Sequence, residues 1–249
     1  KTVLITGATS GFGKAFAAKF AANGYKLIIT GRRQDRLEAI KKELEHKTAV
    51  HALHFDVQDR EATFKAIGSL PAEWQDIDVL INNAGLALGR DFVDEASLDD
   101  WETMIDTNLK GLMYVSKAVL PFMIKNKKGH IINIGSTAAK EVYEKGNAYC
   151  ATKSAVEAIS KGMRIDLLRH GIKVTAIHPG AAETEFSVVR FKGDEGQASK
   201  VYDGFQPLSA EDVADVAFFT TTLPPHVCIN DLVLTCTAQA NSLYFYKQG

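Results

Sequence analysis

A tyrosine and a lysine, Tyr149 and Lys153, stand four positions apart in a stretch with helical hydrophobic spacing, so their side chains share one helix face. A phenol has an ordinary pKa of about 10, which is too high for an effective base at neutral pH. A nearby ammonium group stabilises the phenolate and lowers that pKa. The pair is therefore a candidate general acid/base, and the alternative is a surface lysine beside a half-buried tyrosine.

Ser136 follows the β-rich run 130–135 and precedes the helix that carries Tyr149. A hydroxyl at a strand end could donate a hydrogen bond to a substrate oxygen, which makes Ser136 a candidate for catalysis and substrate binding. Tyr-x-x-x-Lys pairs are common by chance, and the serine upstream makes this one more specific. Cys150 should point to another side of the helix, so we expect it to pack rather than react.

The run TGATSGFG (residues 6–13) lies directly after the first β-rich run and opens a helical pattern. Its glycines allow a tight turn and close approach to a pyrophosphate, and a helix N-terminus adds free N–H groups and a positive dipole end. The spacing differs from the general G-x-G-x-x-G fingerprint, so an ordinary strand–helix turn is the alternative. The position favours phosphate binding, with the candidates Gly7, Thr9, Ser10, Gly11, Phe12 and Gly13.

The second β-rich run ends in two arginines, Arg32 and Arg33. An NAD-binding fold tends to place an acidic residue here, about 20 residues past the glycine turn, to hold the ribose 2′-hydroxyl. Guanidinium groups instead suit a 2′-phosphate, through charge and paired hydrogen bonds. The arginines therefore favour NADP(H) as the cofactor, against the alternative of two solvated surface charges.

Two further turns follow strand patterns. Asp56 and Val57 come after the third, where a carboxylate could accept from an adenine amino group, although a turn or cap aspartate explains Asp56 nearly as well. Asn83, Ala84 and Gly85 come after the fourth, and their small side chains leave room for a flat ring system. Both turns are candidate parts of the cofactor site.

Strand and helix patterns alternate along the chain, which predicts βαβ units, a parallel sheet and an α/β, doubly wound Rossmann fold. The expected strands are Val3–Thr6, Lys26–Thr30, Ala49–Phe55, Val79–Asn82, His130–Gly135 and Lys173–His178. The expected helices are Lys14–Ala22, Asp35–Glu45, Glu61–Ile67, Leu98–Lys125 and Ala148–Arg169. Ligands of such sheets bind beyond the carboxyl ends of the strands, where all the candidates above lie.

The 249 residues fit one domain, 1–249, with a core of its own. The polar stretch Phe191–Gly204 reads as a loop, and we expect residues 181–208 to form a substrate loop or lid. Ser209 is the expected N-cap of a following helix.

Composition excludes several other classes. Lys plus Arg number 29 against 30 Asp plus Glu, so the basic excess typical of nucleic-acid binding is missing. No apolar run is long enough for a bilayer and the N-terminus does not resemble a signal peptide, so with three scattered cysteines we expect a cytoplasmic protein without membrane or nucleic-acid partners. The seven histidines form no metal motif, and His178 is expected to line the cofactor pocket rather than hold a metal.

Taken in order, these motifs resemble the short-chain dehydrogenase/reductase family over essentially the whole chain. The matching residues are TGATSGFG (6–13), NNAG (82–85), Asn108, Ser136, YCATK (149–153), Pro179-Gly180 and Thr184. The resemblance implies that Tyr149 exchanges the substrate proton, that Lys153 lowers its pKa and binds the nicotinamide ribose, and that Ser136 polarises the carbonyl. It further implies a water held by Asn108 as a proton relay, and a nicotinamide bordered by Pro179, Gly180 and Thr184.

Longer stretches are similar to the NADP-dependent 3-hydroxy acid dehydrogenases, also called serine 3-dehydrogenases. These stretches are GRRQDRLE (31–38), LPAEW (70–74), NNAGLALG (82–89), DWETMIDTN (100–108), GHIINIGSTA (129–138) and TEFSVVRFKGD (184–194). That subgroup oxidises serine, allo-threonine and related 3-hydroxy acids, reduces 3-oxo acids such as malonic semialdehyde, and is usually tetrameric. The resemblance therefore implies a small hydroxy or oxo acid substrate and a homo-oligomer.

Such substrates carry a carboxylate, and Arg190 is the candidate that binds it, with Arg90 as a second; a solvated surface charge is the alternative for both. Which charged residues of the segment 139–145 face the pocket stays open. A broad NADPH-dependent carbonyl reductase is the main alternative function, and an acyl-carrier-protein reductase is a weaker one. A non-catalytic NADP-binding regulator should lack part of the four-residue set Asn108, Ser136, Tyr149 and Lys153, which this chain keeps whole.

Overall fold

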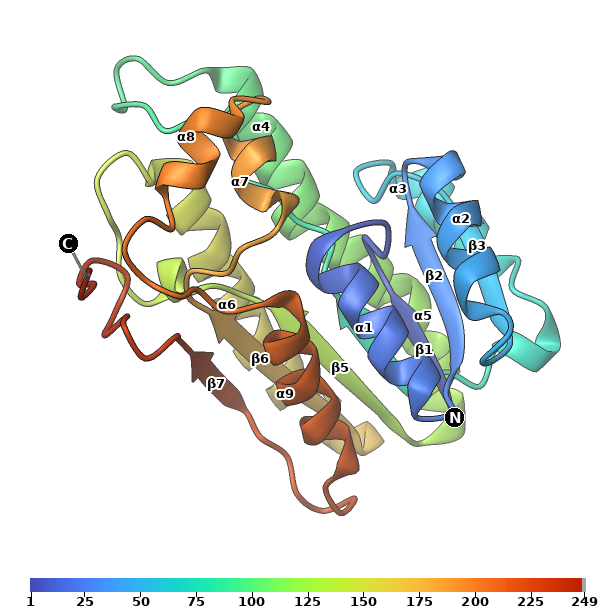
Figure 1. Ribbon diagram of the computed structural model, residues 1–249. Coiled ribbons are helices and arrows are strands. Elements are labelled where there is room, and N and C mark those ends of the chain that lie inside the picture. The colour runs from blue at the N-terminus through green and yellow to red at the C-terminus, as the bar shows by residue number, and fades with distance from the viewer. Residues whose placement is uncertain (248–249) are drawn as a thin grey trace.

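The computed structural model describes residues 1–247 and contains one parallel sheet of seven strands in the order β3-β2-β1-β4-β5-β6-β7 (Figure 1). The strands are β1 (Thr2–Ile5), β2 (Lys26–Gly31), β3 (Val50–His54), β4 (Val79–Asn82), β5 (Gly129–Ile134), β6 (Ile172–Pro179) and β7 (Asp231–Leu234). The central strands are buried on both faces, which explains why they are rich in Ile, Leu and Val. The predicted doubly wound α/β fold is confirmed, with all six expected strands present.

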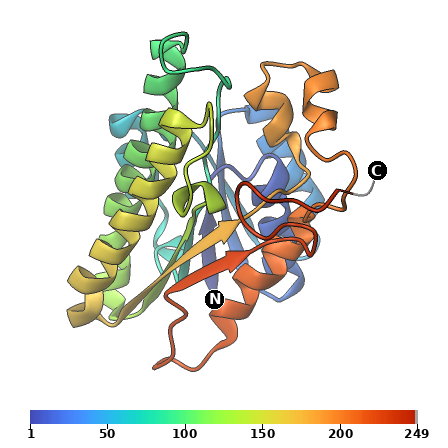
Figure 2. The ribbon, with the colours of Figure 1, turned by 90° about the vertical axis from the view of Figure 1, so that its left-hand side faces the viewer.

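Helices cover both faces of the sheet (Figure 2). On one face, α1, α2 and α9 pack Phe16, Phe20 and Leu37 against the strands; on the other, α3, α5 and α6 contribute Ile67 and Val119. The helices are α1 (Gly11–Ala22), α2 (Gln34–Leu44), α3 (Arg60–Gly68), α4 (Leu98–Ile105), α5 (Leu112–Asn126), α6 (Asn147–Leu167), α7 (Glu185–Arg190), α8 (Glu195–Lys200) and α9 (Ala210–Thr222). Short 3₁₀ turns lie at η1 (Ala72–Trp74), η3 (Thr137–Ala139) and η4 (Leu168–His170).

The prediction of one uninterrupted helix over Leu98–Lys125 was wrong in one respect. A π-helical stretch, η2 (Asp106–Gly111), separates α4 from α5. Hydrophobic periodicity does not reveal a π turn, because one extra residue per turn leaves the flanking patterns intact. Asn108 lies inside this stretch.

The segment Phe191–Gly204 is not an irregular loop, as its polarity indicated, because it contains α8. The side chain of Asp194 caps this helix by accepting from the backbone N–H of Gln197 at 2.9 Å. Strand β7 was also missed, because its four residues are only partly buried at the sheet edge. The cap expected at Ser209 is confirmed, with Asp212 completing a capping box.

The chain crosses from one side of the sheet to the other between β1 and β4, which are neighbours in the sheet. The connections after these strands therefore diverge and leave a crevice at their carboxyl ends, where doubly wound folds bind ligands. Among residues 1–247, no helix has both the length and the apolar character needed to cross a bilayer.

Candidate functional site

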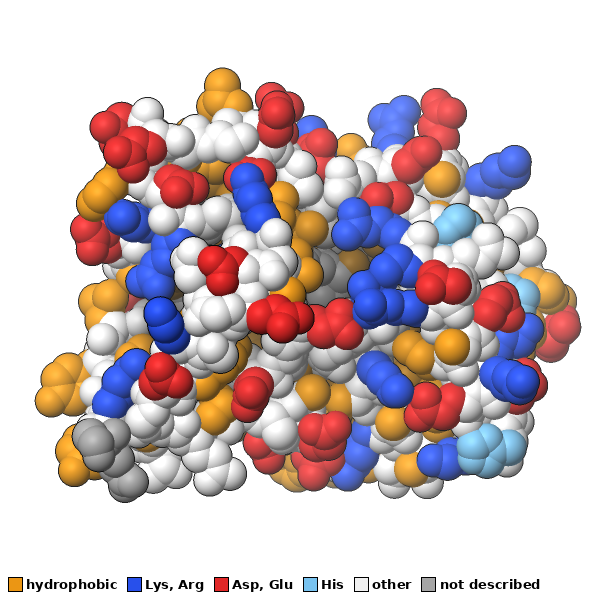
Figure 3. Space-filling view, turned by 45° about the horizontal axis from the view of Figure 1, so that its top comes forward, with side chains coloured by type: hydrophobic (Ala, Val, Ile, Leu, Met, Phe, Trp, Pro, Cys, Tyr) orange, Lys and Arg blue, Asp and Glu red, His pale blue; other side chains and the backbone are white. Residues whose placement is uncertain are grey.

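A cavity of about 790 Å³ lies at the carboxyl ends of the strands. Figure 3 looks toward this end, where the surface is hollowed and blue basic side chains gather beside the hollow. Of the residues singled out in the sequence, twenty line the cavity: Gly7, Thr9, Ser10, Gly11, Phe12, Arg32, Arg33, Asp56, Val57, Asn83, Ala84, Gly85, Arg90, Ser136, Tyr149, Lys153, Pro179, Gly180, Thr184 and Arg190. Gly13 and Asn108 lie behind its wall.

The glycine-rich turn between β1 and α1 depends on two backbone features. Gly7 and Gly11 have φ angles of +65° and +47°, in the left-handed region that favours glycine. Gly13 supports the turn from below, because a Cβ on it would overlap the carbonyl oxygen of Gly7. The amide of Asn83, after β4, donates to the carbonyl oxygen of Thr6 at 2.9 Å and ties the two neighbouring strand ends together.

The two arginines after β2 lie beside this turn. Nη2 of Arg33 donates to the hydroxyls of Thr9 and Ser10, both at 3.1 Å, so a cation stands against the N-terminus of α1. Arg32 lies 3.6 Å from the carboxylate of Asp56. Two guanidinium groups and a helix N-terminus together form a strongly anion-attracting edge.

Glu185, the first residue of α7, reaches across to the same edge. Its carboxylate receives hydrogen bonds from Nη1 of Arg36 at 2.9 and 3.1 Å and lies 3.7 Å from Nη1 of Arg33. The segment after β6 therefore closes over the cavity and contacts the residues after β2. Sequence spacing gives no sign of this contact, which joins positions 149 apart.

Ser136, Tyr149 and Lys153 come together at the inner end of the cavity. Nζ of Lys153 donates to the carbonyl oxygen of Ile134 at 3.0 Å and lies 5.9 Å from the centre of the Tyr149 ring. Burial lowers the pKa of Lys153 to about 8. Burial raises the pKa of Tyr149, and a hydrogen bond with Ser136 and the charge of Arg190 oppose that rise. The cation expected beside the phenol is thus joined by a second one.

Asn108 is buried beneath these residues in the π-helical stretch. Its Oδ1 accepts from the backbone N–H of Leu86 at 2.8 Å, and its Nδ2 donates to the Leu86 carbonyl at 2.8 Å and to Oγ1 of Thr152 at 3.1 Å. A Cβ placed on Gly85 would lie 3.2 Å from Oδ1 of Asn108 and 3.6 Å from Nζ of Lys153. Asn108 and Lys153 therefore both approach Gly85, and Asn108 links η2 to the turn after β4.

Arg190 is the second cation beside Tyr149. Its guanidinium carbon lies 5.5 Å from the ring centres of both Tyr149 and Tyr143, and its Nη1 donates to the Tyr143 hydroxyl at 3.0 Å. Nε and Nη2 are buried and have no hydrogen-bond partner within residues 1–247. A buried cation with unmet donors is costly unless an anion joins it. Arg90 is exposed, and its guanidinium lies 5.9 Å from the Tyr143 ring.

The structure also shows which residues of the charged segment 139–145 face the cavity. Tyr143 and Glu144 line it, whereas Lys140 pairs with Asp231 at 2.8 Å and the carboxylate of Glu141 accepts from the backbone N–H of Ser242. Helical or strand periodicity could not reveal this, because residues 140–146 form an irregular turn.

The C-terminal segment supplies cavity residues that sequence reasoning missed. Gln239 accepts from the backbone N–H of Ala181 at 2.8 Å and fills the space that a Cβ on Gly180 would occupy. Phe245 stacks on Phe205 with ring centres 5.1 Å apart. Only the fold brings this segment to the site, so no local signal marks it.

His178 does not line the cavity, contrary to expectation. It is fully buried behind Ser136, at the end of β6. Cys150 is buried as expected, and among the described residues no cluster of three His, Cys, Asp or Glu side chains has a metal-binding arrangement.

Residues 1–194 match the family described as short chain dehydrogenase. The chain is 50% identical over 239 residues to the NADP-dependent 3-hydroxy acid dehydrogenase YdfG of Escherichia coli K12, covering 96% of each protein. It is 46% identical over 233 residues to the serine 3-dehydrogenase of Agrobacterium fabrum, covering 94% of this chain and 92% of the relative.

Solved structures agree with the sequence relatives. The closed form of serine dehydrogenase complexed with NADP+ superposes with a TM-score of 0.93 at 48% identity and full coverage of both chains. Serine dehydrogenase from Escherichia coli gives 0.84 at 44% identity, covering 96% of this chain and 100% of the other. Motifs, strand order and these likenesses agree, and the chain belongs to the short chain dehydrogenase family.

Proposed function

We propose that this protein is an NADP(H)-dependent oxidoreductase that interconverts 3-hydroxy acids and 3-oxo acids. The observation that carries the substrate class is Arg190, which lines the cavity beside Tyr149 and whose buried Nε and Nη2 lack partners within residues 1–247. The relatives named 3-hydroxy acid dehydrogenase and serine 3-dehydrogenase support the same assignment.

The cavity fits an NADP molecule in its residue types. The glycine-rich turn offers backbone N–H groups to a pyrophosphate, and Arg32 and Arg33 offer charge to a 2′-phosphate. Asp56 and Val57 would border the adenine, and the turn Asn83–Gly85 the ribose next to it. Pro179, Gly180 and Thr184 would border the nicotinamide, together with Tyr149 and Lys153. When bound, the nicotinamide accepts or returns a hydride.

In the oxidation direction, Tyr149 removes the proton of the substrate hydroxyl as hydride leaves its carbon; in reduction it returns that proton. Ser136 donates a hydrogen bond to the same substrate oxygen and fixes its direction. Lys153 stabilises the phenolate and holds the ribose beside it. Asn108, which approaches Gly85 as Lys153 does, would hold a water through which the proton reaches solvent.

Arg190 binds the substrate carboxylate through its two unpartnered donors, Nε and Nη2, while its Nη1 is held by the Tyr143 hydroxyl. A charge-assisted pair of this kind is directional and strong in a buried site. It would set the distance between the carboxylate and the carbon that reacts at Tyr149, and so favour a hydroxyl on the third carbon.

We further propose one domain over residues 1–249, with 181–208 as the lid over the substrate. We also propose a cytoplasmic protein that forms a homo-oligomer. Cys150, Cys228 and Cys236 are free thiols, as a reducing compartment would keep them. Ile165 and Leu168 are each 71% exposed near the end of α6, which supports a contact between copies.

The test is NADPH absorbance with purified protein and a substrate panel. Serine, allo-threonine, 3-hydroxyisobutyrate and 3-hydroxypropionate are offered with NADP, and uncharged ketones with NADPH. We expect turnover confined to the carboxylates. Turnover of uncharged ketones alone would replace this proposal with a general carbonyl reductase.

A further inference from the structure

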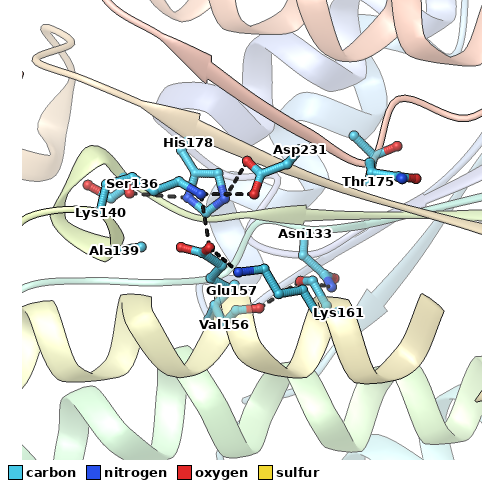
Figure 4. Close-up of polar contacts among 12 residues, drawn as sticks. Asn133, Ser136, Ala139, Lys140, Val156, Glu157, Lys161, Thr175, His178 and Asp231 are labelled. Carbon is cyan, nitrogen blue, oxygen red and sulfur yellow. Dashed lines mark hydrogen bonds and ion pairs between the residues drawn. The ribbon is translucent and has the colours of Figure 1, made fainter. Parts of the chain in front are cut away.

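A chain of polar contacts runs behind the catalytic residues, outside the cavity (Figure 4). Its centre is His178, whose side chain is 0% exposed. Nδ1 of His178 lies 3.2 Å from the carbonyl oxygen of Ser136, and Nε2 lies 3.2 Å from Oδ1 of Asp231, the first residue of β7. One imidazole ring on β6 thus contacts the segment after β5 and the first residue of β7.

The ring is held tightly against the residue before Ser136. A Cβ on Gly135 would overlap Nδ1 of His178, so the imidazole lies directly on the backbone. Close packing of this kind transmits a shift of the ring to Ser136, because the interior has little free space to absorb it. The lack of a side chain at Gly135 is what permits the contact.

Asp231 also holds the other end of the same segment. Its Oδ2 lies 2.8 Å from Nζ of Lys140, and Lys140 lies 3.0 Å from the carboxylate of Glu157. Glu157 stands two helical turns beyond Tyr149 on α6. The segment 136–140 is therefore fixed at its first residue through His178 and at its last residue through Asp231 and Glu157.

Both groups that the ring nitrogens of His178 face are hydrogen-bond acceptors. A carbonyl oxygen and a carboxylate only accept, and a neutral imidazole has one N–H. Burial lowers the pKa of His178, while Asp231, the Ser136 carbonyl and Glu157 raise it and Lys140 lowers it further. Nε2 has no hydrogen-bond partner within residues 1–247, so its contact with Asp231 is one of distance and charge, which a second proton gained on acidification would strengthen.

The carbonyl and the hydroxyl of Ser136 are coupled. The residue is the N-cap of η3, with its Oγ accepting from the backbone N–H of Ala138 at 3.1 Å. The Ser136 carbonyl also accepts from the backbone N–H of Ala139 at 2.9 Å, so one short turn holds both groups and a constraint on the carbonyl restricts the side chain. We propose that His178 and Asp231 are positioning residues for Ser136, which keep its hydroxyl directed at Tyr149 and at the substrate oxygen. This rests on the role given to Ser136 in the proposed function.

Asp231→Asn, Asp231→Ala and His178→Asn test the proposal. We expect kcat to fall about 10- to 100-fold, as for misplacement of a reacting group, with an unchanged Kd for NADPH. Because the Ser136 hydrogen bond lowers the pKa of Tyr149, its loss should move the rise of the oxidation rate to higher pH. The matched control is Asp215→Asn, which breaks a surface pair with Lys19 and should leave kcat and the pH profile unchanged.

A second measurement is independent of turnover: crystal structures of Asp231→Ala and of the Asp215→Asn control. We expect the Ser136 hydroxyl to move in the first and to stay in place in the second. An unmoved Ser136, or an unchanged kcat in an active enzyme, overturns the proposal. A wild-type protein that turns over none of the panel overturns the proposed function instead, and the crystal structures still decide the role of Asp231.

Discussion

Two cations and a hydroxyl lie near Tyr149, in a site where burial otherwise disfavours the phenolate form. Burial raises the pKa of Tyr149, while Ser136 and Arg190 oppose the rise and Lys153 lies 5.9 Å from the ring. An alcohol oxidation that needs the phenolate should speed up as pH rises. The reverse reaction needs the phenol and should slow down over the same range.

Tyr149→Phe removes the group that exchanges the proton and leaves the ring in place. We expect kcat to fall by about 10²- to 10⁴-fold, the usual contribution of a general acid/base. NADPH binding, followed by fluorescence, should survive. Tyr246→Phe makes the same chemical change at a side chain that is 70% exposed, and should have no effect. Near-normal turnover of Tyr149→Phe would contradict the acid/base assignment.

Arg190→Met keeps much of the side-chain length and removes the charge. Hydrogen bonds to charged groups contribute about 1.5–3 kcal/mol, so KM for a 3-hydroxy acid should rise roughly 10- to 100-fold. Arg90→Met, at an exposed arginine near the same Tyr143 ring, is the matched comparison. A larger rise in KM for Arg90→Met would show that Arg90, and not Arg190, binds the substrate carboxylate.

At the scale of elements, hydrophobic periodicity predicted the strands and helices that are regular and buried. Strands such as β5 and β6 are rich in Ile, Val and Ala and almost wholly buried, so their ends and the residues after them could be placed from sequence. The π turn at Asn108, the short helix α8 and the edge strand β7 were not predicted, because local patterns this short carry little signal. The π turn and β7 position Asn108 and Asp231, and the contacts of these two residues arise only when distant segments meet.

The turn between β1 and α1 gives an element-scale prediction. Gly13→Ala would press a methyl group into the carbonyl oxygen of Gly7, and overpacking of this kind costs about 1–3 kcal/mol of unfolding free energy. Gly162→Ala is the matched change within α6, where nothing lies within 4 Å of the new Cβ. It should stabilise the protein by about 0.5–1 kcal/mol. Urea unfolding of both variants measures the two effects, and equal stabilities would contradict the packing described for the turn.

At the scale of the whole molecule, the cavity is assembled from nearly the full length of the chain. The glycine-rich turn, the arginines after β2, helix α7 and the C-terminal segment all line it. The Arg36–Glu185 pair connects parts 149 positions apart. Family motifs located the first two of these in sequence, whereas the C-terminal wall could not be placed without the fold.

Because the cofactor would contact so many separate segments, its binding should raise the unfolding free energy of the whole protein. A ligand that binds only the folded state stabilises it by about 2.7 kcal/mol at a concentration of 100 Kd. NADP should therefore raise Tm more than NAD at equal concentration, since only NADP carries the 2′-phosphate that Arg32 and Arg33 would bind. In Arg32→Ala/Arg33→Ala, we expect the NADP shift to fall to the size of the NAD shift, which itself should stay unchanged. If the Tm shifts with NADP and with NAD shrink equally, the arginines support the fold of the site and do not bind the 2′-phosphate.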